Sequence, residues 1–253
     1  TILHTSDLHS QIEPFPNTHH RFPGRGGFAP RATLIRKIRK QEENVLLFDA
    51  GDIYQGTPFF NYFKGEVEIK LMSDIAYDAA TLGNHEFDNG LEGLDRNLKY
   101  ANFPFVNSNY DFSNTILKGK IKPYTIFEVE DIKIGVFGLG VALSGLVSPA
   151  LSGNTIYLDP FTKAAEMTHF LKIREKCDLI ICLSHMGLSY EDNRPSDIKL
   201  AKQSINIDVI IGWHSHKTLQ NSLVIKNRDF KDVIIAHAGA SGVNLGRIDV
   251  YLE

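Results

Sequence analysis

Polar residues of the kinds that bind divalent cations gather in five short motifs along this chain. Each motif follows directly after a run of apolar, strand-like residues. The motifs are Asp7-Leu8-His9, Gly51-Asp52, Gly83-Asn84-His85-Glu86, Ser184-His185 and Gly212-Trp213-His214-Ser215-His216. They supply aspartate carboxylates, several imidazoles and one amide oxygen, a donor set that suits a pair of divalent cations. The motifs together predict a two-metal hydrolase site.

The two aspartates differ in what they can do at such a site. Asp7 and His9 are two residues apart, so in an extended backbone both side chains can face one cation. Taken alone, an Asp-x-His sequence is also typical of a surface turn. Asp52 lies beside Gly51, which lets the backbone approach closely, and its two carboxylate oxygens can bridge two cations. Burial of Asp52 without a cation would be costly, and a metal pair removes that cost.

The stretch that begins at Gly83 is the most specific motif. Asn84 offers a neutral oxygen donor suited to Mn²⁺ or Zn²⁺. His85 comes one residue later and points elsewhere, so we expect it to do acid–base chemistry rather than to bind metal. Asp88 can hold the other ring nitrogen of His85, which would complete a base-and-orienter pair. The alternative role for Asp88 is the N-cap of the helix that follows.

Histidines after two later apolar runs complete the donor set. His185 follows the run 179–183, and His214 and His216 follow the run 208–211. A His-x-His pair is common by chance, so the prediction depends on all the motifs lying at strand ends, where parallel α/β sheets open into a crevice. The histidines outside the motifs are expected to be structural or exposed, and they are His4, His19, His20, His169 and His237. Of these, His237 ends a strand and could also approach the site.

Short apolar runs alternate with amphipathic stretches, which predicts an α/β fold. Strands are predicted at residues 1–6, 44–50, 78–82, 103–108, 121–137, 178–184, 207–212, 219–225, 231–238 and 244–252. Helices are predicted at residues 27–42, 64–76, 90–100, 159–176 and 195–204. The first half predicts a mostly parallel sheet, and the consecutive late strands predict antiparallel meanders. We expect a four-layer α/β/β/α sandwich of two mixed sheets, in a single domain over residues 1–253.

Length and composition disfavour several classes of protein. The 253 residues can bury a substantial core, and a net charge of −3 disfavours a protein that binds nucleic acid electrostatically. The sequence has no apolar run of the length that a membrane span requires. Its two cysteines predict neither a disulfide framework nor a thiolate metal cluster, which leaves the compartment undetermined. If a leader has been removed, we expect the periplasm or the cell envelope.

Read together, the motifs resemble the calcineurin-like metallophosphoesterase superfamily. Two longer stretches resemble its 5′-nucleotidase branch, namely Gly51-Asp52-Ile53-Tyr54-Gln55-Gly56-Thr57-Pro58 and Gly83-Asn84-His85-Glu86-Phe87-Asp88. The resemblance extends from Ile2 to Leu252 and is more specific for the metal site than for the substrate. It implies a metallophosphatase fold and two bound cations, with Mn²⁺ or Zn²⁺ expected first and Fe, Co or Ca as alternatives.

The resemblance also implies a role for each matching residue. The first metal would be held by Asp7, His9 and His216. The second would be held by Asn84, His185 and His214. Asp52 would bridge the two metals, and His85 with Asp88 would form the catalytic dyad. Trp213 is bulky where many relatives have a small residue, and His216 stands where some have Gln, but neither difference removes a donor.

Relatives of the 5′-nucleotidase type continue into a C-terminal substrate domain that stacks the nucleobase and contacts the phosphate. This chain ends at Glu253, where the metal domain would end. We therefore expect the substrate domain to be absent from this chain. A separate chain that carries the nucleotidase C-terminal domain is a candidate partner.

The expected reaction is hydrolysis of a small phosphorylated substrate, a nucleoside monophosphate or a related nucleotide ester. Metal-bound hydroxide would attack phosphorus in line, without a covalent enzyme intermediate. Two alternatives stay open. One is hydrolysis of a thiosulfonate or another sulfur ester, as in the sulfur-oxidation branch that shares this metal site. The other is a metal-loaded subunit that is active only with a separate substrate-domain chain.

Overall fold

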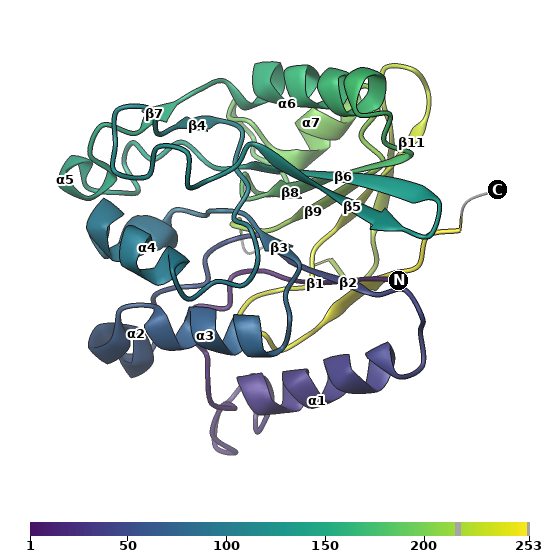
Figure 1. Ribbon diagram of the computed structural model, residues 1–253. Helices are drawn as coiled ribbons and strands as arrows, with labels where there is room; N and C mark the ends of the chain where they lie inside the picture. The colour runs from purple at the N-terminus through teal and green to yellow at the C-terminus, as the bar shows by residue number, and fades with distance from the viewer. Residues whose placement is uncertain (216–218, 252–253) are drawn as a thin grey trace.

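Two β-sheets lie face to face, and each carries helices on its outer surface (Figure 1). The computed structural model describes residues 1–215 and 219–251. Helices α6 (Pro160–His169) and α7 (Asp197–Gln203) lie above the six-stranded sheet in Figure 1, and α1 (Phe28–Arg39) and α3 (Glu66–Asp74) lie below the four-stranded sheet. This arrangement confirms the predicted α/β/β/α sandwich.

The first sheet is mixed and has the strand order β12-β1-β2-β3. Its strands are β1 (Ile2–Thr5), β2 (Leu46–Asp49), β3 (Ala79–Ala80) and β12 (Gly246–Ile248). Strands β1, β2 and β3 are parallel, and β12 pairs with β1 in the antiparallel direction. Parallel pairing places the carboxyl ends of β1, β2 and β3 at one edge of the sheet.

The second sheet is also mixed and has the strand order β10-β11-β9-β8-β6-β5. Its strands are β5 (Tyr124–Val129), β6 (Ile132–Leu139), β8 (Leu179–Ser184), β9 (Val209–Gly212), β10 (Leu223–Lys226) and β11 (Asp232–Ala236). The central strands β6, β8, β9 and β11 are parallel, and antiparallel strands close both edges.

The period-two alternation of β8 divides its side chains between two cores. Leu179, Ile181 and Leu183 face the other sheet and belong to the core between the two sheets. Ile180 and Cys182 point to the opposite face and pack in the core beneath α6 and α7. A central parallel strand is buried on both faces, which is why this segment is a continuous apolar run. Cys182 is buried here as a small apolar side chain.

The meander predicted for the C-terminal strands is wrong in one respect. Strands β10 and β11 form the expected antiparallel pair. Strand β12 then leaves this sheet and pairs with β1 of the other sheet. Because β12 has only three residues, its apolar pattern carries no information about which sheet it joins. The crossing ties the end of the described chain to its beginning.

Two other predicted strands differ from the structure. Within the described chain, residues 103–108 form isolated bridges to Ala80 and Lys122 instead of a named strand. Pro104 has no N–H to donate, which interrupts a longer ladder. The segment 121–137 is not one strand but the hairpin of β5 and β6, which turns at the polar pair that follows Val129.

Several short elements were not predicted. They are helices α2 (Pro58–Phe63) and α5 (Pro149–Ser152), the 3₁₀ turn His85–Phe87, and the paired strands β4 (Tyr110–Asp111) and β7 (Ile156–Tyr157). The helix predicted at 159–176 is present, and its last part, Phe170–Arg174, is a π-helical turn that continues α6. Helix α4 (Gly90–Leu98) lies within its predicted range. Among the helices of residues 1–215 and 219–251, none is both long and apolar enough to cross a membrane.

Candidate metal centre

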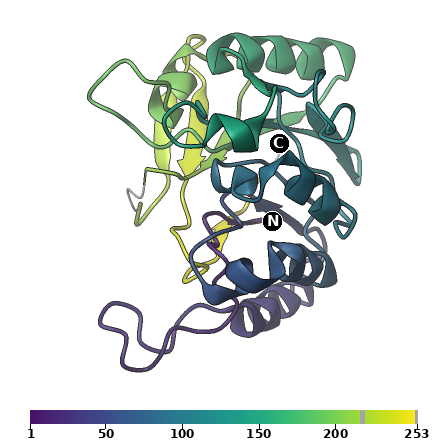
Figure 2. The same cartoon turned by 90° about the vertical axis from the view of Figure 1, so that its left-hand side faces the viewer.

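The carboxyl ends of strands from both sheets meet at the edge of the sandwich that faces the viewer in Figure 2. Asp7, Asp52 and Asn84 follow β1, β2 and β3 of the first sheet. His185 and His214 follow β8 and β9 of the second sheet. The sandwich therefore places the predicted donors of both sheets on one edge, as expected for parallel strands.

Backbone hydrogen bonds hold the first two motifs together. The N–H of Asp7 donates to the carbonyl of Gly51 at 2.8 Å, and the N–H of His9 donates to the carbonyl of Asp52 at 3.1 Å. Asp7, His9 and Asp52 have φ values of 46°, 48° and 55°, in the left-handed region that non-glycine residues rarely adopt. Such strain persists only where the surroundings fix it, and it is common at functional sites.

The Asp52 carboxylate lies between two groups of candidate ligands. Its Oδ1 accepts the backbone N–H of His85 at 2.8 Å, and its Oδ2 lies 2.9 Å from His185 Nε2. One group comprises His9, Asp52 and His85, and the other comprises Asp52, His185 and His214. Within each group the potential ligand atoms lie within 4.8 Å of one another. Asp52 belongs to both groups, as a bridging ligand must.

Gly83 is required at this point because Asp52 leaves no room for a side chain. A Cβ on Gly83 would lie 2.2 Å from Asp52 Oδ1 and 2.7 Å from the Asp52 backbone nitrogen. The close approach lets the third motif pack directly on the carboxylate. Any larger residue at position 83 would displace Asp52.

The donors fit divalent cations. Asn84 Oδ1 is buried and has no hydrogen-bond partner among the described residues. The side chains of Asp7 and Asp52 are also buried, and burial raises the pKa of the Asp7 carboxyl. Burial lowers the pKa of His185, but the charges of Asp52 and Asp7 outweigh it and raise that pKa to about 10. A cation can take the place of a proton between His185 Nε2 and Asp52 Oδ2, which lie 2.9 Å apart, and can also satisfy Asn84.

His85 and Asp88 form the expected pair. His85 Nδ1 lies 2.7 Å from Asp88 Oδ2, so Asp88 holds one ring nitrogen and leaves Nε2 for other contacts. Burial lowers the pKa of His85, but the hydrogen bond to Asp88 and the charge of Asp52 raise it to about 8. Asp88 is not the helix N-cap considered as an alternative, because Asn89 occupies that position before α4.

Glu86 has a structural role at this centre that the sequence did not predict. Its carboxylate is fully buried and accepts three backbone N–H groups, from Asp52 at 2.9 Å, Ile53 at 2.7 Å and Gly83 at 2.5 Å. Burial raises the pKa of Glu86, and these hydrogen bonds oppose that shift. Glu86 thus fixes the backbone that presents the bridging carboxylate. In the sequence, only the position of Glu86 inside the third motif pointed to a role at this centre.

Replacement of Glu86 by glutamine should weaken both the fold and the metal centre. The glutamine amide would set an N–H₂ donor against backbone donors, and each buried group left unpaired costs about 1–3 kcal/mol. Urea unfolding of the metal-free protein and titration with Mn²⁺ measure the two effects. Glu92→Gln is the matched control, because Glu92 is an exposed glutamate in α4. Equal stability and Mn²⁺ binding in Glu86→Gln and Glu92→Gln would contradict this role.

Among the histidines outside the two ligand groups, His19 is half-buried and His20 is exposed, both in the loop 10–26. His216 lies outside the described residues. His237 is buried and pairs with Asp197 rather than with the candidate ligands. His4 is buried, and burial together with the charge of His237 lowers its pKa to about 3. His169 is exposed in α6, in agreement with the prediction.

The loop 10–26 projects from the sandwich at the lower left of Figure 2. Arg21 lies over the ring of Phe22, with 5.3 Å between the guanidinium carbon and the ring centroid. Arg25 donates to Asn244 Oδ1 at 3.3 Å. These contacts lie within the loop and with a neighbouring loop, as is usual for solvated loop charges.

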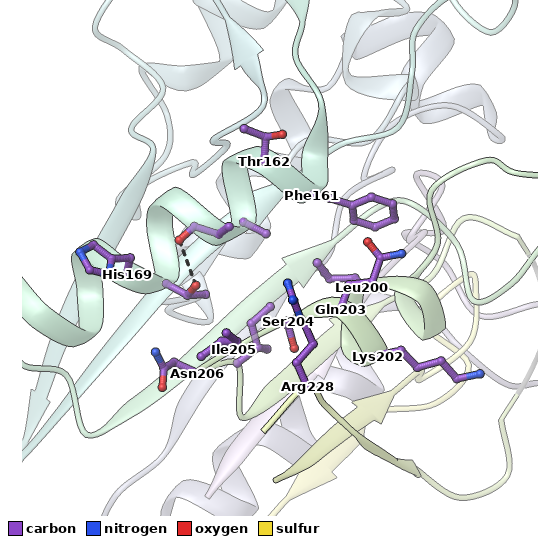
Figure 3. A pocket seen from close by; sticks show the side chains of 14 residues that line it. Phe161, Thr162, His169, Leu200, Lys202, Gln203, Ser204, Ile205, Asn206 and Arg228 are labelled. Atoms are coloured by element: carbon purple, nitrogen blue, oxygen red, sulfur yellow. Dashed lines mark hydrogen bonds between the residues drawn. The ribbon is translucent and has the colours of Figure 1, made fainter. Parts of the chain in front are cut away.

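Two cavities differ in their relation to this centre. A cavity of about 640 Å³ lies between α6 and α7, and its lining residues include Phe161, Leu200 and Arg228 but none of the candidate ligands (Figure 3). A second cavity of about 230 Å³ is lined by His214, Tyr190 and other residues. The second cavity borders the candidate metal centre through His214.

Comparison with known proteins agrees with this geometry. Residues 1–218 match the family described as Calcineurin-like phosphoesterase. The chain belongs to the calcineurin-like phosphoesterase family. Membership implies divalent metal ions, and the described residues of this family member contain the two groups of candidate ligands around Asp52.

Several relatives of this calcineurin-like phosphoesterase are nucleotidases. It is 36% identical over 275 residues to a snake venom 5′-nucleotidase from Crotalus adamanteus, covering 100% of this chain and 45% of the relative. The 5′-nucleotidase precursor from Thermus thermophilus superimposes with a TM-score of 0.84 at 32% identity, covering 95% of this chain and 49% of that one. The Haemophilus influenzae NAD nucleotidase superimposes with a TM-score of 0.83 at 32% identity, covering 95% of this chain and 50% of that one. The chain thus spans about half the length of these relatives.

Proposed function

We propose that this chain hydrolyses phosphate esters of nucleotides with the help of two divalent cations. The observation that carries the proposal is the shared Asp52 carboxylate, which belongs to two ligand groups at the edge where both sheets end. The His85–Asp88 pair beside it supports an enzymatic rather than a structural role. The nucleotidase names of several relatives support nucleotides as the substrate class.

The chain offers enough donors for two cations. Asp7, His9 and His216 are proposed for the first, and Asn84, His185 and His214 for the second, with Asp52 bridging both. Carboxylate, imidazole and amide donors together suit Mn²⁺ or Zn²⁺. When bound, such a pair activates a water molecule and polarises the phosphoryl oxygens.

The protein's own part of the reaction is proton transfer and substrate placement. Asp88 fixes the orientation of the His85 imidazole through Nδ1, so Nε2 can hold a proton for the leaving oxygen. Proton donation lowers the barrier because the leaving alkoxide would otherwise carry a full negative charge. His85 therefore acts as the general acid in this proposal.

The cavity beside His214 can receive the rest of the substrate. Its lining includes Tyr190 and Arg194, and the Arg194 guanidinium carbon lies 4.1 Å from the centroid of the Tyr190 ring. Arg194 also pairs with Asp192 at 2.9 Å, and both side chains are exposed. A cation and an aromatic face suit an anionic substrate with a planar base.

Metal removal and a substrate panel test the proposal. The chelator-treated protein should be inactive, and Mn²⁺ should restore hydrolysis of nucleoside monophosphates by at least about 10²-fold, because metal assistance contributes several kcal/mol. The panel contains AMP, p-nitrophenyl phosphate and a thiosulfonate ester. Hydrolysis of the thiosulfonate in preference to AMP would favour the sulfur-ester alternative and contradict the proposal.

A separate experiment tests the alternative that this chain is a subunit that is active only with a substrate-domain chain. If the Mn²⁺-loaded chain hydrolyses nothing alone, a separately expressed C-terminal nucleotidase domain is added to the same assay. Activity that appears only in the mixture would identify a two-chain enzyme. Activity of the chain alone would remove the need for a partner.

A further inference from the structure

A buried group of polar side chains behind the second ligand group has no part in the chemistry described so far. Ser184 Oγ donates to Asp197 Oδ1 at 2.5 Å. His237 Nε2 lies 2.8 Å from the other carboxylate oxygen of Asp197. The side chains of Asp197 and His237 have no exposed surface. Burial of a carboxylate is costly, so its retention at this point calls for a function.

The three side chains join elements that are distant in sequence. Ser184 is the last residue of β8, Asp197 is the first residue of α7, and His237 follows β11. They pack directly against the last residue of β9, because a Cβ on Gly212 would lie 2.4 Å from Asp197 Oδ2 and 3.0 Å from His237 Nε2. The carboxylate of Asp197 therefore connects the carboxyl ends of β8, β9 and β11.

Two of the strand ends that Asp197 connects, those of β8 and β9, lie next to candidate metal ligands. Ser184 immediately precedes His185, and Gly212 lies two residues before His214. The intervening Trp213 ring lies 5.4 Å from the His237 ring, centroid to centroid. The ring centroids of His185 and His214 are 5.0 Å apart. His185 Nδ1 also lies 2.7 Å from the carbonyl oxygen of Ala50, so one side of this ring is held by the first sheet. Both imidazoles follow closely after strand ends that Asp197 joins.

We propose that Asp197 and His237 are a positioning pair that sets the separation of His185 and His214 for the second cation. The proposal rests on the metal centre proposed above. His214 has φ 85°, a conformation that is unfavourable for a non-glycine residue, so the turn needs support from its surroundings. Partners behind a metal ligand that fix its orientation commonly affect metal affinity by about 10- to 100-fold.

Mn²⁺ binding to the metal-free protein tests the pair with a readout that is independent of turnover. In Asp197→Ala, the dissociation constant of the second Mn²⁺ should rise by about tenfold or more, while the first Mn²⁺ binds as in the wild type. Electron paramagnetic resonance should show the mononuclear Mn²⁺ spectrum persisting to higher metal concentrations before the coupled binuclear spectrum appears. The fluorescence of Trp213, the single tryptophan, follows the same binding step.

A pair of substitutions at His237 keeps the test decisive if Asp197→Ala does not fold. His237→Gln retains an N–H donor toward Asp197. The dissociation constant of the second Mn²⁺ in this variant should stay within about threefold of the wild-type value. His237→Leu removes the donor and should behave like Asp197→Ala. Equal affinities for the second Mn²⁺ in His237→Leu, His237→Gln and the wild type would overturn the proposal.

Asp208→Ala is the matched control for a loss of stability alone. Asp208 Oδ2 accepts the N–H of Ile180 at 2.8 Å and so ties β8 to the segment before β9, but at the opposite end of the strands. This variant should lose stability without any change in Mn²⁺ binding. If Asp208→Ala lowers the affinity for the second Mn²⁺ as much as Asp197→Ala does, Asp197 and His237 have only a structural role. If the wild type binds no second Mn²⁺, the proposed function itself fails.

Discussion

Replacement of Asp52 by asparagine should abolish the binding of both divalent cations and, with it, hydrolysis. Asp52 belongs to both ligand groups; its Oδ1 accepts the backbone N–H of His85 at 2.8 Å, and its Oδ2 lies 2.9 Å from His185 Nε2. An amide has one neutral oxygen and an N–H₂ donor, and it cannot present an anionic oxygen to each cation. Metal assistance contributes several kcal/mol, so turnover should fall by more than about 10³-fold.

Calorimetric titration with Mn²⁺ and initial rates at saturating substrate measure these two losses. Asp49→Asn is the control, because Asp49 is also buried and bonds to Thr5 Oγ1 at 2.6 Å and to the N–H of Gly51 at 2.9 Å. Burial raises the pKa of Asp49 to about 8, so a neutral amide resembles its state near pH 7. Wild-type Mn²⁺ binding by the Asp52→Asn variant would exclude a bridging role.

Replacement of His85 by alanine should leave both cations bound but lower kcat by about 10²- to 10⁴-fold, the usual contribution of a general acid. The reason is that Asp88 holds Nδ1 of His85, so the ring can present Nε2 to the leaving oxygen only in one orientation. KM should change much less than kcat, because the proton is donated in the transition state. Asp88→Asn should cause a smaller loss, since the ring itself remains.

Metal analysis of the His85 variant decides between two roles. A potential ligand atom of His85 lies within 4.8 Å of those of His9 and Asp52, so the geometry alone also permits metal binding by this ring. Loss of one cation from His85→Ala would make His85 a ligand instead of an acid. Wild-type turnover would remove it from the chemistry altogether. His169→Ala, at an exposed position of α6, controls for the loss of a histidine.

The convergence of the motifs could be predicted because it follows from strand direction. Asp7, Asp52 and Asn84 each come directly after a parallel strand, and parallel strands end at the same edge of a sheet. The same reasoning brings His185 and His214 from the second sheet to this edge. The two sheets with their outer helices were also predicted, because apolar runs alternated with amphipathic stretches. The chemical roles of these residues stay predictions until the variants are measured.

The contacts behind the ligands could not be predicted from the sequence. Glu86 acts on backbone N–H groups, and sequence patterns do not show where a backbone donor will lie. Asp197 is the first residue of α7 and resembles an ordinary acidic residue at a helix start, yet tertiary packing buries it against Gly212. The position of β12 was missed for a related reason, because three residues are too few to specify a sheet.

The position of Asp52 between two cations is tested most directly by anomalous scattering from crystals of the protein grown with Mn²⁺. We expect two manganese peaks about 3.5–4 Å apart, with one oxygen of Asp52 or each of its two oxygens bound between them. A single peak, or two peaks that do not share Asp52 as a ligand, would contradict the bridging role.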